Sequence, residues 1–206
     1  MLRKIVFIFF CTFLFQSAKG QFKGGFYAGI NGTQVDGDRI AGFYKLGMNL
    51  AATVEYPLGE HMGASMEIAY TQKGSQTKWQ QGVPRQYFLK LDYVEVPLML
   101  NYHDNKKVTL SAGIGINALV YNYEEIVNYN PTNNLSSIRS LDKKDIELKA
   151  GASYQLSRHW MINVVYSYSV LSMGISDDSP YLNGGLFNNL VSFRLGYMIK
   201  GMAQSK

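Results

Sequence analysis

The chain has 206 residues, with 20 lysines and arginines against 15 acidic residues, and it is rich in tyrosine (15) and glycine (20). This length suits a single domain. The net charge of +5 is weak evidence for nucleic-acid binding, because part of it lies in the first 20 residues. Beyond them no apolar run approaches the roughly 18 residues that a transmembrane helix needs, so no helical span is predicted there.

The N-terminal segment has the pattern of a secretory signal peptide. Arg3 and Lys4 form a basic n-region, residues 5–15 form an apolar h-region, and Ala18 and Gly20 form an A-x-G cleavage site. We therefore predict a signal peptide over residues 1–20 and one domain over residues 21–206. The only cysteine, Cys11, lies in the h-region, so the mature domain is expected to have no disulfide and no lipid anchor. Cleavage leaves 17 basic against 15 acidic residues.

Segments in which apolar and polar residues alternate follow along the rest of the chain. Several runs are ten or more residues long, whereas strands of soluble proteins have about 5–6 residues. A tilted strand that crosses a bilayer needs about 9–11 residues. The eight segments lie near residues 22–33, 41–58, 61–74, 86–103, 107–123, 143–157, 159–172 and 187–200.

The connections between these segments alternate in length. Short ones occur at residues 59–60, 104–106 and 158, and long ones at residues 34–41, 75–85, 124–142 and 173–186. Short turns on one side and long loops on the other are typical of bacterial outer-membrane barrels. We therefore predict an all-β fold, an eight-stranded antiparallel up-and-down transmembrane β-barrel in the outer membrane of a Gram-negative bacterium. With eight strands its lumen holds side chains and no wide channel.

Aromatic residues lie where the membrane interfaces are expected. Tyr44 and Tyr56 are twelve residues apart on one face, roughly 40 Å along a strand at about 3.3 Å per residue. A tilt of about 40° projects this to about 30 Å, slightly more than the apolar band of about 25 Å. The predicted girdles comprise Tyr56, Tyr102, Trp160 and Tyr197 at the short-turn rim, and Tyr44, Tyr70, Tyr87 and Tyr168 at the other.

The segment "LDYVEVPLML", residues 91–100, combines an apolar run with charges and a proline. From Val94 onward the even-numbered residues are apolar and are predicted to face lipid, which places Glu95 and Pro97 in the lumen. Upstream, the apolar residues from Tyr87 to Tyr93 have the opposite phase. This pattern predicts a β-bulge near Asp92 that moves the upstream apolar residues to the lipid side. Pro97 is expected to forfeit one ladder hydrogen bond.

Two motifs resemble a known family. "EIAYTQKG", residues 67–74, and "LDYVEVPLMLNY", residues 91–102, are similar to the PorT-like outer-membrane β-barrel proteins of the Bacteroidetes type. The resemblance covers essentially the whole mature chain and implies an eight-stranded outer-membrane barrel. The family's namesake takes part in a protein-secretion system, and most members have no assigned role.

Charged residues of both signs fall on the predicted inward face. They could form a proton or ion path, or a structural ion-pair network that plugs the barrel. We favour the network, because removing one partner of a buried pair costs about 3–5 kcal/mol. We expect Glu67, Glu95 and Arg194 to interact, since an arginine fork can hold two carboxylates. The predicted lumen residues are Lys45, Glu55, Glu67, Glu95, Asp145, Glu147, Lys149 and Arg194.

The histidines and loop acids of the sequence do not predict a catalytic site or a metal site. His61, His103 and His159 fall at the short turns, and no carboxylate or cysteine is spaced to complete a metal shell. G-x-S-x-G and H-E-x-x-H motifs are absent from the sequence, so we predict no enzyme activity and no cofactor. The loop acids are interpreted as turn residues, since they lack the remainder of a calcium loop. They are Asp36, Asp38, Asp177 and Asp178.

Two functional hypotheses follow. The first is a monomeric, non-enzymatic integral outer-membrane protein, surrounded by outer-membrane lipid. Its long outer loops would serve a structural, adhesive, assembly or secretion-related role, with a protein partner there and no nucleic acid. The alternative is a soluble secreted lipocalin-like barrel that binds an apolar ligand. The two differ in the face that is apolar, which is the outside in the first and the inside in the second.

Overall fold

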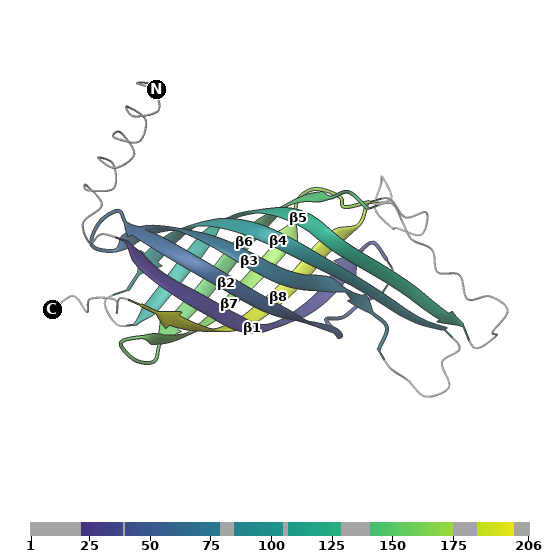
Figure 1. The fold of residues 1–206 in the computed structure, drawn as a ribbon, viewed down its shortest axis with the longest axis horizontal. Coiled ribbons are helices and arrows are strands. Elements are labelled where there is room, and N and C mark those ends of the chain that lie inside the picture. The colour runs from purple at the N-terminus through teal and green to yellow at the C-terminus, as the bar shows by residue number, and fades with distance from the viewer. Residues whose placement is uncertain are drawn as a thin grey trace, which may run out of the picture.

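A computed structural model describes residues 22–38, 40–78, 85–104, 107–128, 141–174 and 185–199. The predicted signal peptide and the loop residues Asp177 and Asp178 lie outside these ranges. Eight β-strands form a closed barrel (Figure 1). Their bounds are β1 Lys23–Asp36, β2 Lys45–Pro57, β3 Met62–Gln76, β4 Arg85–His103, β5 Val108–Asn128, β6 Lys144–Gln155, β7 Trp160–Ser169 and β8 Phe187–Met198. None of the described segments is a helix long and apolar enough to cross a membrane.

The topology confirms the predicted up-and-down barrel. Each strand pairs antiparallel with its neighbour in the chain, and β8 closes the barrel against β1, with pairs from Gly25↔Met198 to Asp36↔Phe187. The three short connections, which follow β2, β4 and β6, lie at one end of the barrel. We call this the inner end, and the opposite end the outer end. β4 and β5 extend furthest toward the outer end (Figure 1).

The two faces of the sheet have opposite polarity. Apolar side chains on the outside are strongly exposed, for example Leu46 at 67% and Ile68 at 61%. Side chains on the inside are mostly polar or charged and buried, for example Asn31 and Glu147 at 0%. A lipocalin-like barrel requires the reverse arrangement, so that alternative is wrong. The outward apolar surface is the one that a bilayer requires.

The predicted irregularity near Asp92 is confirmed, but its consequence differs from the prediction. Asp92 pairs with Tyr121 and Tyr93 with Leu119, so the additional residue is Val120 on β5. β5 therefore carries the bulge, and β4 keeps one phase throughout. Tyr87 is consequently an inward, buried residue and not a member of the outer girdle.

The apolar residues of the outer half of β4 are packed inside the barrel because other apolar residues meet them there. Leu91 and Tyr93 are fully buried, and Met173 and Leu186, from the connection between β7 and β8, lie against them. We call this cluster the outer plug. It comprises Val35, Tyr87, Leu89, Leu91, Tyr93, Met173 and Leu186.

Pro97 interrupts the pairing as expected. The ladder between β3 and β4 is continuous up to Met66↔Leu98 and resumes at Ala69↔Glu95. Two pairs are missing between these points because Pro97 has no N–H to donate. The pairing of Pro97 with Gly115 on β5 remains, so the strand stays in the barrel.

Candidate functional site in the barrel lumen

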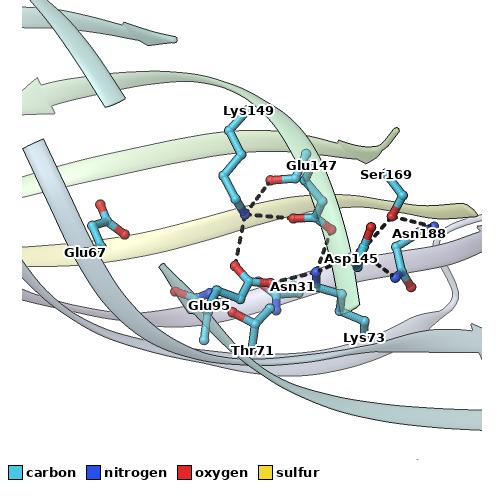
Figure 2. Close-up of polar contacts among 12 residues, drawn as sticks. Asn31, Glu67, Thr71, Lys73, Glu95, Asp145, Glu147, Lys149, Ser169 and Asn188 are labelled. Carbon is cyan, nitrogen blue, oxygen red and sulfur yellow. Dashed lines mark hydrogen bonds and ion pairs between the residues drawn. The ribbon is translucent and has the colours of Figure 1, made fainter. Parts of the chain in front are cut away.

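Lys73 on β3 is the centre of a buried ionic cluster. Its Nζ lies 2.5 Å from Glu147 Oε1 and 2.6 Å from Glu95 Oε1, and these three side chains are 0–2% exposed. Asp145 Oδ2 is 4.0 Å away. Figure 2 shows the ammonium group pointing into the space between these carboxylates. The lysine thus joins β3 to β4 and β6 across the lumen.

Lys149 on β6 completes the cluster from the other side. Its Nζ lies 2.9 Å from Glu95 Oε2 and 2.9 Å from Glu147 Oε2, and it donates to Ser167 at 3.1 Å. Glu95 and Glu147 are therefore each shared between the two lysines, in a closed arrangement of alternating charge (Figure 2). Such sharing satisfies the buried carboxylates and ammonium groups together.

Asp145 is held mainly by neutral donors. Its Oδ2 accepts hydrogen bonds from Ser169 Oγ at 2.8 Å and Asn188 Nδ2 at 3.1 Å. Asn188 also donates to the Tyr93 hydroxyl at 3.3 Å, which links the ionic cluster to the outer plug. We call Lys73, Glu95, Asp145, Glu147 and Lys149 the central cluster.

Arg194 forms a separate pair closer to the inner end. Its guanidinium binds both carboxylate oxygens of Glu67, at 2.7 and 3.3 Å, and its Nε donates to Asn163 Oδ1 at 2.7 Å. The guanidinium also lies 4.4 Å from the centre of the Tyr27 ring. Arg194 therefore pairs with Glu67 as expected, but the expected network does not extend to Glu95. The Arg194 fork is fully used by one carboxylate, and Glu95 has two lysines nearer to it.

Lys73 is the member of the central cluster that the sequence interpretation missed. It lies in phase with Glu67 and Thr71 on β3, so period two already placed it on the inward face. Its ammonium group also lies 4.4 Å from the centre of the Tyr93 ring. The outer plug and the central cluster thus meet at a lysine–tyrosine contact, just as Arg194 meets Tyr27 further in.

The two remaining predicted lumen residues lie apart from the central cluster. Glu55 is near the inner end, where it accepts from Asn101 at 2.8 Å and lies 3.2 Å from His103 Nε2. Lys45 is at the outer end of β2, where its Nζ donates to the Leu46 carbonyl at 2.7 Å and lies 5.3 Å from the centre of the Phe88 ring.

The histidines pack at the inner rim. The ring centre of His61 lies 6.1 Å from that of Tyr102, and the ring centre of His159 lies 5.7 Å from that of Tyr197. Among the described residues no three histidine, cysteine or acidic side chains gather as a metal would require. Asp38 Oδ1 accepts from the backbone N–H of Ile40 at 2.8 Å, as expected of a turn residue.

The predicted girdle residues other than Tyr87 all project from the outside of the barrel. Tyr44, Tyr56, Tyr102, Trp160 and Tyr197 are 39–49% exposed, and Tyr70 and Tyr168 are half-buried. At the inner rim Trp160 and Tyr197 meet edge to face at 5.0 Å. At the outer end Tyr168 stacks on Phe187 at 6.3 Å.

Two small cavities lie in the lumen among the described residues. A cavity of about 30 Å³ lies between Tyr27, Glu55 and Arg194, and one of about 20 Å³ lies between Glu95, Lys149 and Arg194. A water molecule needs about 10–15 Å³ on this measure, so each cavity holds about one or two waters.

A closed barrel with an apolar outside and a charged, filled inside is a transmembrane β-barrel. Residues 15–173 match the family model of the outer membrane protein beta-barrel domain, and the chain belongs to this family. The protein is thus an outer-membrane β-barrel protein of a Gram-negative bacterium. No curated protein matches the chain.

Solved structures match the chain at low sequence identity, and the one with a TM-score above 0.5 among the following three shares the fold. Ail, the attachment invasion locus protein of Yersinia pestis, in complex with the heparin analogue sucrose octasulfate, is 16% identical. The match covers 87% of this chain and 99% of Ail, with a TM-score of 0.53. Neisserial surface protein A is 12% identical over 85% of this chain and 95% of its own, with a TM-score of 0.47. OprG of Pseudomonas aeruginosa is 15% identical over 87% and 95%, with a TM-score of 0.39.

Proposed function

We propose that the protein is a plugged, monomeric, non-enzymatic outer-membrane barrel. Its role is structural, adhesive or assembly-related and is carried by the long outer connections. The observation that supports this most directly is the central cluster. Lys73 and Lys149 tie β3, β4 and β6 together through side chains that are almost fully buried. Above them the outer plug fills the lumen with apolar groups.

Two further features support the proposal. The lumen residues of opposite charge pair with one another, as Arg194 does with Glu67, so they serve as a plug and not as a solvated path. The aromatic residues at both ends of the lipid face anchor the barrel at the two membrane interfaces. In this scheme the long connections face the exterior of the cell and the three short ones face the periplasm.

Conductance measurements test the plugged lumen. We expect the purified protein, folded in planar bilayers, to give no stable conductance steps, and vesicles that contain it not to swell in small sugars. A porin in the same lipid provides the positive control. Stable steps from wild-type protein would overturn the proposal. Folding of each sample is checked by its faster migration before boiling on a denaturing gel.

We also propose that the protein is related to the PorT-like proteins, and a secretion assay in cells tests this relation. The two motifs that carry the resemblance contain Glu67, Lys73 and Glu95, which are lumen residues that pair across strands. If the protein assists secretion, deleting its gene should deplete exported proteins from the medium, and the Lys73→Met variant should not restore them. Unchanged secretion in the deletion strain would leave only the structural or adhesive roles.

We also propose that residues 1–20, which lie outside the described residues, are removed on export. The mass of the intact protein isolated from outer membranes tests this. A mass that begins at Gln21 supports cleavage at the A-x-G site, and a mass that retains Met1 or Arg3 contradicts it.

A further inference from the structure

The charges of the central cluster do not balance. Its two lysines supply two positive charges, whereas its three carboxyl groups supply three negative charges when all are ionised. Glu95 and Glu147 each lie within 2.9 Å of both lysines. Asp145 has no cation of its own, because Lys73 lies 4.0 Å away and is already shared. An uncompensated charge is costly in a buried site, and a carboxyl group there avoids the cost by binding a proton.

The hydrogen bonds to Asp145 leave one of its oxygens available for that proton. Ser169 on β7 and Asn188 on β8 both donate to Oδ2 (Figure 2), and Asn188 also contacts the hydroxyl of Tyr93 on β4. Among the described residues Oδ1 has no hydrogen-bond partner. The charged side chains around Asp145 are those of the central cluster: Lys73 on β3, Glu95 on β4, and Glu147 and Lys149 on β6.

Asn117 on β5 is the group that a proton on Asp145 would meet. It pairs with Asp145 on one side and with Glu95 on the other, and it is 2% exposed. Side chains that lie opposite each other on antiparallel strands have their Cβ atoms about 4.5–5.5 Å apart. A Cβ on Gly115 would meet both Asn117 Oδ1 and the stem of Lys149, so the carboxamide points into the central cluster.

The carboxamide of Asn117 supplies the second observation. Within the part of the chain that the structure describes, neither its oxygen nor its nitrogen has a hydrogen-bond partner. A buried polar group without a partner destabilises the folded state. The carboxamide oxygen can only accept a hydrogen bond. A hydrogen atom on Asp145 would satisfy this oxygen, which an ionised Asp145 cannot do.

We propose that Asp145 binds one proton in the folded barrel at neutral pH, and that Oδ1 holds this proton and donates it to the carboxamide of Asn117. The central cluster then has two positive and two negative charges. The proposal goes beyond the role of the cluster as a link between strands, which it leaves in place. A metal cation fits less well, because it needs several oxygen ligands and the ammonium group of Lys73 would repel it.

Folding of the barrel then takes up a proton. An aspartate in an unfolded chain is ionised above about pH 4, whereas Asp145 in the folded barrel keeps its proton. The resulting stabilisation is complete below that pH and declines as the pH rises, by about tenfold in the folding equilibrium constant per pH unit. A cavity of about 20 Å³ beside Glu95 and Lys149 has room for a water through which the proton exchanges.

Infrared spectroscopy of the barrel folded in lipid vesicles tests the proposal directly. A protonated carboxyl group gives a carbonyl band that is separate from those of carboxylates. We expect this band in the wild type at neutral pH, and we expect it to shift when the aspartates are isotope-labelled at the side-chain carboxyl. Asp145→Asn should remove the band, and Asp142→Asn, which changes an exposed acid just before β6, should retain it. A wild type without the labelled band, or a band that persists in Asp145→Asn, would overturn the proposal.

The Glu147→Gln variant tests whether charge balance is what retains the proton. It leaves two carboxyl groups against two lysines, so Asp145 should ionise and its band should disappear although Asp145 itself is unchanged. A band of full intensity in this variant would contradict the proposal. The wild-type spectrum with labelled aspartate needs no substitution, so it decides the question even if a variant does not fold.

Urea titrations at several pH values give an independent measurement. From about pH 6 to about pH 8 the folding equilibrium constant of the wild type should fall by up to about tenfold per pH unit relative to that of Asp145→Asn. The same pH dependence in both proteins would count against a bound proton. Exchanging choline chloride for sodium chloride at constant ionic strength should change neither protein. A sodium-dependent stabilisation that Asp145→Asn abolishes would show a metal ion in place of the proton and would also overturn the proposal.

Discussion

Replacing Lys73 by methionine is the most informative change that the lumen offers. Methionine keeps most of the length of the side chain and removes its charge. The ammonium group lies within 2.6 Å of Glu95 and Glu147, in side chains that are at most 2% exposed. Its removal leaves Lys149 as the cation of the central cluster against three carboxylates. Breaking a buried ion pair in this way costs about 3–5 kcal/mol, and we expect the free energy of unfolding to fall by that amount.

A urea titration of the barrel folded in lipid vesicles, followed by tryptophan fluorescence, measures this loss. Lys143→Met is the matched control, because Lys143 is exposed and precedes the strand that carries Asp145, Glu147 and Lys149. Exposed substitutions usually change stability by less than about 0.5 kcal/mol. The control therefore separates loss of a buried partner from loss of positive charge in general.

A double variant distinguishes the ion pair from simple packing. Lys73→Met/Glu95→Gln removes one charge of each sign and restores the charge balance of the cluster. Groups in direct contact show interaction energies of about 0.5–3 kcal/mol, so the double variant should be more stable than the sum of the two single losses predicts. A Lys73→Met loss under about 1 kcal/mol, or strict additivity in the cycle, would refute the view that the central cluster holds the strands together.

Three further results are expected. Leu91→Ala should lower the free energy of unfolding by about 2–5 kcal/mol, since Leu91 is fully buried in the outer plug; a negligible loss in the same titration would place this residue against lipid. Val96→Glu should destabilise the barrel because it puts a carboxylate against lipid, where Arg or Lys costs about 2–4 kcal/mol and an acid less. Glu95→Gln should cost about 1–3 kcal/mol, and a harmless Val96→Glu would show that the in–out assignment is wrong. Protease added to intact cells should cut within residues 129–140 or 175–184, which lie outside the described residues; cleavage confined to the short connections would reverse the topology.

The sequence predicted the barrel well because a closed sheet in a membrane imposes one period on every strand. The positions of all eight strands follow from that alternation, and Pro97 interrupts the ladder where its missing N–H requires. Strand ends were less predictable. β5 runs to Asn128, whereas the residues from Glu124 onward were expected in a loop. The continuation pairs with β4, which itself pairs with β3 as far as Gln76↔Phe88, and the composition of β5 alone does not reveal this pairing.

The outer half of β4 shows where period two becomes ambiguous. Apolar residues at Leu89 and Leu91 were interpreted as lipid-facing because the rest of the lipid face is apolar. The structure buries them, since the lumen itself changes from polar to apolar toward the outer end. Alternation in the sequence shows which residues of a strand share one face. It does not show whether the inside or the outside of the sheet is apolar at each level along the barrel axis. The partners that decide it, Met173 and Leu186, come from a connection and not from a strand.

For a related reason, the sequence could not predict which charged side chains pair with one another inside the lumen. Inward positions can be listed from period two, but the stagger of eight tilted strands decides which of them share a height. Glu95 and Arg194 are both inward, yet Arg194 lies level with Glu67 and Asn163. Glu95 instead meets Lys73 and Lys149.

The arrangement of layers along the axis bears on what the barrel can do. From the outer end inward, the lumen holds the apolar outer plug, the central cluster and the Arg194–Glu67 pair. Tyr93 contacts the ammonium group of Lys73, and Tyr27 contacts the guanidinium of Arg194, at 4.4 Å in each case. The outer plug is not wholly apolar, because the buried carboxylate Glu124 lies opposite Leu89 in the same layer. The larger group of buried charges lies further in, where Lys73 and Lys149 join strands through Glu95 and Glu147. The lumen charges of the central cluster therefore act first as links between strands.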